Sequence, residues 1–276
     1  MKEANEFTVK IKALTPIWTG DENGECKTLR ETGIIGSLRW WYEALIRGLG
    51  GSACDPTNES TRCNLEQNKF KKAISSGKSI QEALDEQLCP SCQLFGCTGW
   101  ARRFRLEVDT DNNEIELRFI ELREVKDIEW VLLNKTLQII SKYGALGGKI
   151  AEPQYGLIEI KQNGLERKVY TMKNYNAELE KYFKKNGSNV KNPNIKRFIF
   201  VHQNLNEGIE NDLKNNLPFL KGKSGKGKRY FYKTYNGKPY RLFMYAENDN
   251  EYKKIVDFLE KKEVQFKKGE EVLNGA

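Results

Sequence analysis

The chain opens on a strict alternation of apolar and polar side chains, and the period then changes. Residues 7–13 carry an apolar side chain at every second position, which is the pattern of a half-buried strand. From Ser37 onward the large apolar residues follow helical spacing, at Leu38, Trp41, Leu45 and Leu49. Gly50 and Gly51 end that run as a C-terminal cap does. The pattern therefore predicts a strand and then an amphipathic helix that starts near Ser37.

The pattern continues with two strands, a helix and a further strand. Apolar residues alternate over residues 104–108 and 115–119, and the polar stretch between them favours a turn. Residues 127–143 then follow helical spacing, and residues 155–160 read as a strand. The predicted order is βαββαβ, the ferredoxin-like arrangement.

The second half of the chain repeats this order. Strands are predicted over residues 195–201, 229–235 and 240–245, with a short one near 264–266. Helices are predicted over residues 207–217 and 250–261, and Asn236-Gly237 is a strong hairpin signal. A polar helix near residues 178–185 would join the halves. The predicted fold class is α+β, with two tandem ferredoxin-like (βαββαβ) modules in residues 1–160 and 161–276.

Cysteines mark an insertion at residues 52–99 of the first module. Cys89 and Cys92 form a C-x2-C pair, and Cys54 and Cys63 precede them across a lysine-rich stretch (65–88) that reads as helical. Four thiolates around one structural zinc ion would fasten a segment with little core of its own. The alternative is that these cysteines are small buried apolar residues or surface thiols without a role. Two further cysteines could substitute as ligands: Cys26 and Cys97.

Positive charge is concentrated in one part of the chain. The net charge is +8, and residues 219–241 hold eight basic and no acidic residues: Lys221, Lys223, Lys226, Lys228, Arg229, Lys233, Lys238 and Arg241. Such a run can be a solvated, lysine-rich loop. Because six aromatic residues are interleaved with it, the window suits phosphate contacts combined with base stacking. The first five of these basic residues are therefore candidate RNA contacts.

Several kinds of chemistry are disfavoured. Residues 222–228 resemble a phosphate-binding P-loop, but Arg229 stands where the magnesium-binding Ser or Thr is needed, and the segment leads into a predicted strand. His202 is the single histidine, so a histidine acid–base pair cannot form. No apolar run is long enough to span a membrane, and the first residues do not resemble a secretion signal. We therefore expect a cytoplasmic protein without an active site.

Three segments resemble a known family. They are residues 14–20 (LTPIWTG), residues 32–45 (TGIIGSLRWWYEAL) and residues 88–104, which contain LCPSCQLFG and TGWARRF. Together they resemble the RAMP superfamily of CRISPR-associated proteins, and within it the first subunits of the type III-B (Cmr) RNA-guided complex. The resemblance is densest over residues 7–160. It implies a non-catalytic subunit that binds CRISPR RNA, target RNA or both near one end of the complex, beside other Cmr subunits.

The resemblance also implies where RNA would lie, at the start of the first helix and along the glycine-rich loop before the last strand of the first module. The implied contacts are Gly33, Gly36, Ser37, Arg39, Trp40, Arg102, Arg103, Gly147, Gly148 and Lys149. Backbone amides at the helix start would hold a phosphate. Trp41 belongs to the apolar stripe, whereas Trp40 lies off it and could stack on a base or anchor a neighbouring subunit. Glu152 and Pro153 depart from the small and basic residues usual in this loop. Two rivals stay open: a RAMP-type endoribonuclease that processes guide precursors, and a stand-alone zinc-containing RNA-binding protein.

Overall fold

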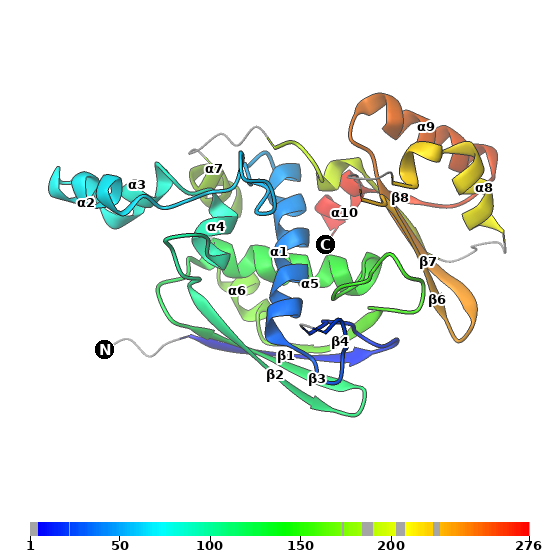
Figure 1. Cartoon of the computed structure of the whole chain (residues 1–276), viewed down its shortest axis with the longest axis horizontal. Helices are drawn as coiled ribbons and strands as arrows, with labels where there is room; N and C mark the ends of the chain where they lie inside the picture. Colours follow the sequence, from blue (N-terminus) through cyan, green and yellow to red (C-terminus); the bar gives the residue numbers. More distant parts are fainter. Residues whose placement is uncertain are drawn as a thin grey trace.

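The computed structural model describes residues 5–21, 23–172, 174–183, 190–202, 208–222 and 227–275. It has a mixed α+β fold with two four-stranded antiparallel sheets. Figure 1 shows the first sheet below the long helices α1 and α5, the second sheet on the right, and the helices α2 and α3 projecting on the left. Among the described residues, no helix has the length and apolar character needed to cross a bilayer.

The first sheet has the strand order β2-β3-β1-β4. Its strands are β1 (Glu6–Ala13), β2 (Phe104–Asp111), β3 (Glu114–Glu121) and β4 (Ile158–Asn163). Helix α1 (Glu31–Gly48) follows β1, and helix α5 (Asp127–Tyr143) lies between β3 and β4. This order of elements and strands is consistent with a ferredoxin-like module.

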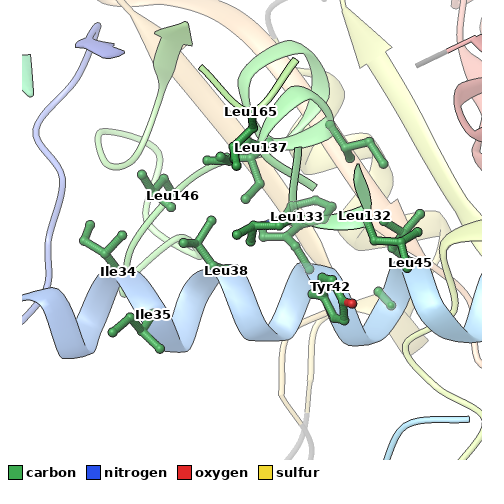
Figure 2. Close-up of a cluster of buried hydrophobic side chains, with 14 of the residues drawn as sticks. Ile34, Ile35, Leu38, Tyr42, Leu45, Leu132, Leu133, Leu137, Leu146 and Leu165 are labelled. Carbon is green, nitrogen blue, oxygen red and sulfur yellow. The ribbon is translucent and has the colours of Figure 1, made fainter. Parts of the chain in front are cut away.

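Helices α1 and α5 form the centre of the core. Figure 2 shows Ile34, Leu38 and Leu45 of α1 directed toward Leu133 and Leu137 of α5. All five side chains are fully buried. Spacings of three and four residues place these side chains on one face of each helix, so their burial against the sheet drives the module together.

The second sheet repeats the strand order of the first, as β6-β7-β5-β8. Its strands are β5 (Phe198–His202), β6 (Tyr230–Tyr235), β7 (Lys238–Tyr245) and β8 (Lys267–Lys268). The helices beside it are α8 (Ile209–Asn216), α9 (Asp249–Lys261) and α10 (Gly269–Gly275). Asn236 and Gly237 both have positive φ angles, 51° and 72°, which confirms the predicted hairpin turn.

Strand β5 is buried on both faces and joins two cores. Phe198 and Phe200 belong to the core built around α1 and α5. Ile199 and Val201 point the other way, into the core shared with α8 and α9. Because side chains alternate along a strand, one short strand holds the second sheet between its own helices and those of the first module.

The insertion between α1 and β2 contains three short helices. They are α2 (Gln67–Ser75), α3 (Ile80–Asp85) and α4 (Pro90–Phe95). The single helix expected over residues 65–88 is wrong, because Gly77 adopts a φ of 92° and Ser79 starts α3 with a capping box. Helices α6 (Glu166–Thr171) and α7 (Tyr175–Phe183) then connect the two sheets.

Further boundaries differ from the sequence-based prediction: β4 begins at Ile158 rather than residue 155, β7 begins at Lys238 rather than residue 240, and β8 lies at Lys267–Lys268 rather than at 264–266. Two other differences have a local cause. Helix α1 begins at Glu31, six residues before the predicted Ser37, so Gly33 and Gly36 are helical. The strand expected from residue 195 begins at Phe198, because the turn Ile195–Arg197 precedes it and the Asn194 side chain accepts a hydrogen bond from the Lys196 amide. In the first case the apolar periodicity begins later than the helix, and the glycines hide the start.

The two sheets meet at the tryptophan pair of α1. Trp41 is fully buried, as predicted, and packs on Phe198 and Phe243 with ring centroids 5.6 and 5.3 Å apart. Trp40 is half-buried and packs edge-on against Phe198, Phe231 and Tyr245. Trp40 therefore packs on the second sheet of its own chain and keeps part of its surface exposed.

Candidate RNA interface and cysteine cluster

The four predicted metal ligands converge. The sulfur atoms of Cys54, Cys63, Cys89 and Cys92 all lie within 4.8 Å of one another, although the residues come from three separate segments of the insertion. The Cys54 and Cys92 sulfurs are 3.4 Å apart, far beyond a disulfide bond, and all four cysteines are free. Zinc–sulfur bonds of about 2.3 Å in a tetrahedron place the sulfurs about 3.8 Å apart, so the cluster has the size of a four-thiolate metal site.

Backbone and side-chain donors already point at these sulfurs. The Cys54 amide donates to the Cys89 sulfur over 3.5 Å, and the Cys89 amide donates to the Cys63 sulfur over 3.3 Å. The Arg39 guanidinium donates to the Cys92 sulfur over 3.0 Å. Such donors orient metal ligands and offset the negative charge of thiolates.

The thiols also titrate unequally. Hydrogen bonds from the neighbouring thiols, led by Cys63, hold the pKa of Cys54 well below its usual value. The hydrogen bond to Cys54 raises the pKa values of Cys63, Cys89 and Cys92. Metal ions bind cysteine as the thiolate, so a cation bound by these four sulfurs would displace the protons that they carry.

The two substitute ligands lie outside the group of four. Cys26 is in the loop before α1, where its sulfur accepts a hydrogen bond from the Thr19 amide over 3.3 Å. Cys97 packs beside the cluster, but its sulfur is not among the four mutually close atoms. The sequence-based choice of Cys54, Cys63, Cys89 and Cys92 therefore matches the geometry.

Arg39, Glu43 and Arg47 tie the cysteine cluster to α1. Glu43 pairs with Arg39 over 2.7 Å and with Arg47 over 3.8 Å, the two pairings that their spacing allows. Arg47 also donates to the carbonyl oxygens of Ala53 and Cys54. Burial raises the pKa of Glu43 to about 7, and the two arginines oppose that rise. Arg39 was predicted as an RNA contact, and its guanidinium donates hydrogen bonds to Glu43, the Gly96 carbonyl and the Cys92 sulfur.

Three predicted glycines form a close-packed junction around Trp18 and Thr19. A Cβ atom at Gly33 would lie 2.6 Å from the Thr19 side chain, and one at Gly148 would lie 2.7 Å from the Trp18 ring. Gly147 has a φ of 102°, and a Cβ there would lie 2.7 Å from the Trp18 carbonyl oxygen. Because these three positions lack a side chain, three segments can approach one another closely: the loop after β1, the start of α1 and the loop after α5.

The amides of this junction are mostly used inside the chain. The Gly147 amide donates to the Ser37 hydroxyl over 2.9 Å, and the Gly148 amide donates to the Trp18 carbonyl over 2.6 Å. Gly36 and Ser37 lie inside α1, so their amides belong to the helix ladder. The expectation that Gly36 and Ser37 offer free amides at a helix start is wrong, because α1 starts earlier.

Exposed groups remain at the rim of the junction. Gly36 is exposed on α1, and nothing lies within 4 Å of where its Cβ would stand. Lys149 is exposed, with its ammonium 4.4 Å from the centroid of the Trp18 ring. Trp18 belongs to one of the three resembling segments, and its aromatic type was the signal that could have singled it out.

Three of the eight basic residues in the predicted window are buried. Arg229 is 7% exposed and pairs with Glu251 over 2.7 Å. Lys233 is fully buried and donates to the carbonyls of Glu152 and Tyr155. Arg241 is 2% exposed and lies in the interface between the sheets. The predicted RNA contact Arg229 therefore lies in an ion pair inside the chain.

The other basic residues of the window are less enclosed. Lys228 is half-buried and donates to the Ala151 carbonyl over 3.0 Å, while Lys221 and Lys238 are exposed. Lys223 and Lys226 lie outside the described residues. The segment runs from residue 227 into strand β6, which agrees with the rejection of a P-loop.

The two consecutive arginines before β2, Arg102 and Arg103, lie in different environments. Arg103 is 5% exposed and forms a salt bridge of 3.1 Å with the fully buried Glu129 at the start of α5. Arg103, predicted as an RNA contact, is thus buried in an ion pair of the first module. Arg102 is half-buried, and its carbonyl accepts a hydrogen bond from Arg123.

The model of the family described as the RAMP superfamily matches residues 10–151, just over half of the chain. Among curated protein sequences, none matches.

Two solved structures are similar over nearly the whole chain. One is the crystal structure of Cmr1 from Pyrococcus furiosus in its apo form, with a TM-score of 0.51, 10% identity, and coverage of 96% of this chain and 98% of that one. The other is a cryo-EM structure of the Type III-B Cmr-beta bound to cognate target RNA and AMPPnP, in the presence of single-stranded DNA, in which one chain gives a TM-score of 0.45, 10% identity, and coverage of 95% and 100%. The likeness to Pyrococcus furiosus Cmr1 shows a shared fold.

Proposed function

The chain belongs to the RAMP superfamily, and from that premise we propose that it is a non-catalytic, RNA-binding subunit of a type III-B CRISPR ribonucleoprotein. In this role it contacts guide RNA, target RNA or both near one end of the complex, beside other Cmr-type subunits. The family match carries the proposal, because residues 10–151 include the start of α1 and the loop after α5. The fold shared with Pyrococcus furiosus Cmr1 over both chains agrees with it.

The domain organisation follows from the same premise. The boundary predicted at residue 160 falls inside β4, so the first ferredoxin-like module would extend to Asn163, interrupted by the cysteine-bearing insertion, and the connecting helices and the second module would follow it. The equivalent strand orders of the two sheets support this division. The buried aromatic contact between α1 and β5 makes the two modules one packed unit.

The RNA surface of this proposal is smaller than the sequence suggested. It keeps the rim of the glycine junction, where Gly36 and Lys149 are exposed, and the exposed Lys221, and it adds the exposed Lys238. Lysine ammonium groups supply phosphate contacts without reading the sequence. Binding is therefore expected to depend on salt and to vary little with RNA sequence.

The cysteine cluster would hold one structural zinc ion. Its support is the four-sulfur geometry and the hydrogen bonds donated to the sulfurs. Elemental analysis of freshly purified protein should find about one zinc ion per chain without added metal. Cys92→Ser should lower the zinc content and the melting temperature, whereas the matched change Cys26→Ser should leave the zinc content unchanged. Protein that contains no zinc would remove the metal from this proposal.

The enzyme alternative has a weaker basis. His202 is half-buried beside Tyr240, with ring centroids 5.3 Å apart, and burial lowers its pKa. A single histidine does not supply the acid and the base that RNA cleavage needs. Incubation of the purified protein with labelled CRISPR repeat RNA, with and without divalent metal, tests the point. Intact RNA and a stable complex are expected; specific cleavage products would favour the RAMP-type endoribonuclease.

Purification from the native host separates the other alternative. A subunit of a ribonucleoprotein should carry CRISPR RNA and other Cmr-type proteins through a mild affinity step. Protein that elutes alone, although it binds RNA when purified, would favour the stand-alone RNA-binding module.

A further inference from the structure

A cleft of about 890 Å³ lies between the two sheets. Its walls are the β1–β4 edge of the first sheet, the last residues of α5, and the ends of β5, β6, β7 and β8. Both modules therefore contribute side chains to it. The volume lies in the range of sites that bury ligands of nucleotide size.

Aromatic rings line one wall of this cleft. His202 and Tyr235 each lie edge-on to Tyr240, with ring centroids 5.3 and 5.5 Å away. All three rings are half-buried, so part of each faces the cleft. Tyr143, at the end of α5, adds a fourth half-buried ring from the other module. The Asn236-Gly237 turn holds Tyr235 and Tyr240 near each other at the end of the hairpin.

Positive charge surrounds these rings. The cations that line the cleft are Lys12, Lys142, Arg241 and Lys267, and the one carboxylate among the lining residues is Glu159. Glu159 is itself paired with Lys161 over 2.8 Å. Lys142 and Lys267 are exposed, and Lys267 donates to the Tyr143 hydroxyl over 3.3 Å. Burial is the largest cause that lowers the pKa of His202, and the positive charges of Arg241 and Lys267 lower it further. This agrees with a positive electrostatic potential in the cleft.

We propose that this cleft binds an unpaired stretch of RNA, with bases stacked on Tyr235 and Tyr240 and phosphates held by Lys142 and Lys267. The inference rests on the proposed function and assigns it a site. Partly exposed tyrosine rings beside lysines suit single-stranded RNA, because every unpaired base offers a face on which an aromatic ring can stack. The bases of a duplex already stack on one another, so a duplex could use only the charges. An acidic protein segment would likewise bind through the lysine charges and would not need the tyrosine rings.

The stacking contact can be tested without changing charge. The probe is a fluorescein-labelled single-stranded ten-nucleotide RNA, and binding to the full chain is followed by fluorescence anisotropy. Tyr235→Ala with Tyr240→Ala should weaken binding at least about tenfold, since one stacked base contributes about 1–3 kcal/mol. Tyr235→Phe with Tyr240→Phe keeps the rings and should bind within about twofold of the wild type. Circular dichroism and melting curves identify variants that have lost their fold.

The charge contact has its own signature. Lys142→Gln with Lys267→Gln should reduce the slope of log affinity against log salt by about 1.4, the value for two phosphates on a single strand. The matched pair Lys253→Gln and Lys254→Gln removes the same charge from exposed positions of α9 that do not line the cleft, and should leave the slope unchanged. Unlabelled duplex RNA of the same sequence should compete more weakly than the single strand.

The outcomes separate this inference from the proposed function. If the wild type binds RNA and the alanine pair binds equally well, the cleft assignment is overturned and the proposed function stands. Equal competition by duplex RNA overturns the single-strand preference. A folded alanine pair that keeps RNA binding but loses binding of an acidic peptide assigns the cleft to protein instead. A wild type that binds no RNA overturns both.

Discussion

Arg241, on strand β7 of the second sheet, forms hydrogen bonds with the C-terminal end of helix α5. Its guanidinium donates to the carbonyls of Ile140, Ser141 and Gly144 over 3.3, 2.9 and 2.7 Å. The last carbonyls of a helix have no partner within the helix, and a cation at that end also suits the helix dipole. Arg241 thus caps a core helix of the other module. We expect Arg241→Met to destabilise the protein although both side chains are long and largely apolar.

The size of the loss follows from the carbonyls left behind. The Ile140 carbonyl keeps a hydrogen bond from the Gly144 amide, whereas the Ser141 and Gly144 carbonyls lose the donor that Arg241 supplies. Each buried carbonyl without a partner costs about 1–3 kcal/mol, and methionine fills part of the vacated volume. Burial also lowers the pKa of Arg241 to about 10, so removal of the cation returns some of the cost of burying it. We therefore expect the free energy of unfolding to fall by about 3 kcal/mol. For a chain of this length that corresponds to about 6 °C in melting temperature.

Two variants on the same strand make the measurement specific. Lys238→Met removes an exposed cation from β7 and should change the unfolding free energy by less than about 0.5 kcal/mol. Arg241→Lys keeps the charge but not the planar fork that spans three carbonyls, so its loss should lie between those of the wild type and Arg241→Met. Urea unfolding followed by circular dichroism measures all three. An Arg241→Met variant as stable as Lys238→Met would refute the capping role.

Other predictions concern a buried lysine and two glycines. Burial, with the nearby cation Lys228, lowers the pKa of Lys233 to about 7. The unfolded chain then holds the extra proton between pH 7 and the ordinary lysine pKa, so folding is favoured as pH rises through that window. The difference in unfolding free energy between the wild type and Lys233→Met should therefore shift by about 2 kcal/mol in favour of the wild type when the pH rises from 7 to 9. Urea titrations that give the same difference at both pH values would contradict this. Gly33→Ala should destabilise α1 by about 1–3 kcal/mol, because the new methyl group meets Thr19. Gly36→Ala has open space and should stabilise α1 by up to about 1 kcal/mol; melting curves that do not separate the two glycine variants would count against the junction.

The order of elements was predictable because periodicity and turn chemistry are local properties. The alternation at residues 7–13 became β1, and Asn236-Gly237 became a hairpin turn with two positive φ angles. The cysteine group was predictable for a similar reason, since C-x2-C spacing fixes two ligands of one site. Helix α1 was placed late because Gly33 and Gly36 weaken the helical pattern at its start. Close packing against Thr19, which a sequence does not display, accounts for Gly33.

The direction of the charged side chains was not predictable from composition. Residues 219–241 carry a uniform positive charge, yet Arg229, Lys233 and Arg241 each meet carbonyls or carboxylates that lie far away in the sequence. A strand sends successive side chains to opposite faces, so a basic run over β6 and β7 must divide between the two. Only the packing of the second sheet against α5 decides which cations become caps and which stay in solvent.

The position of the cysteine cluster determines what loss of a metal would do. Its sulfurs pack in a small core of their own with Leu65, Leu84 and Leu88, separate from the two cores that hold the sheets. The link to those cores runs through α1, where Arg39 reaches the Cys92 sulfur and Arg47 holds the carbonyls of Ala53 and Cys54. Because Glu43 still pairs with both arginines when a thiolate is removed, α1 keeps its buried charges compensated. Removal of a metal from this site should therefore loosen helices α2 and α3 while both sheets, and the cleft between them, stay folded.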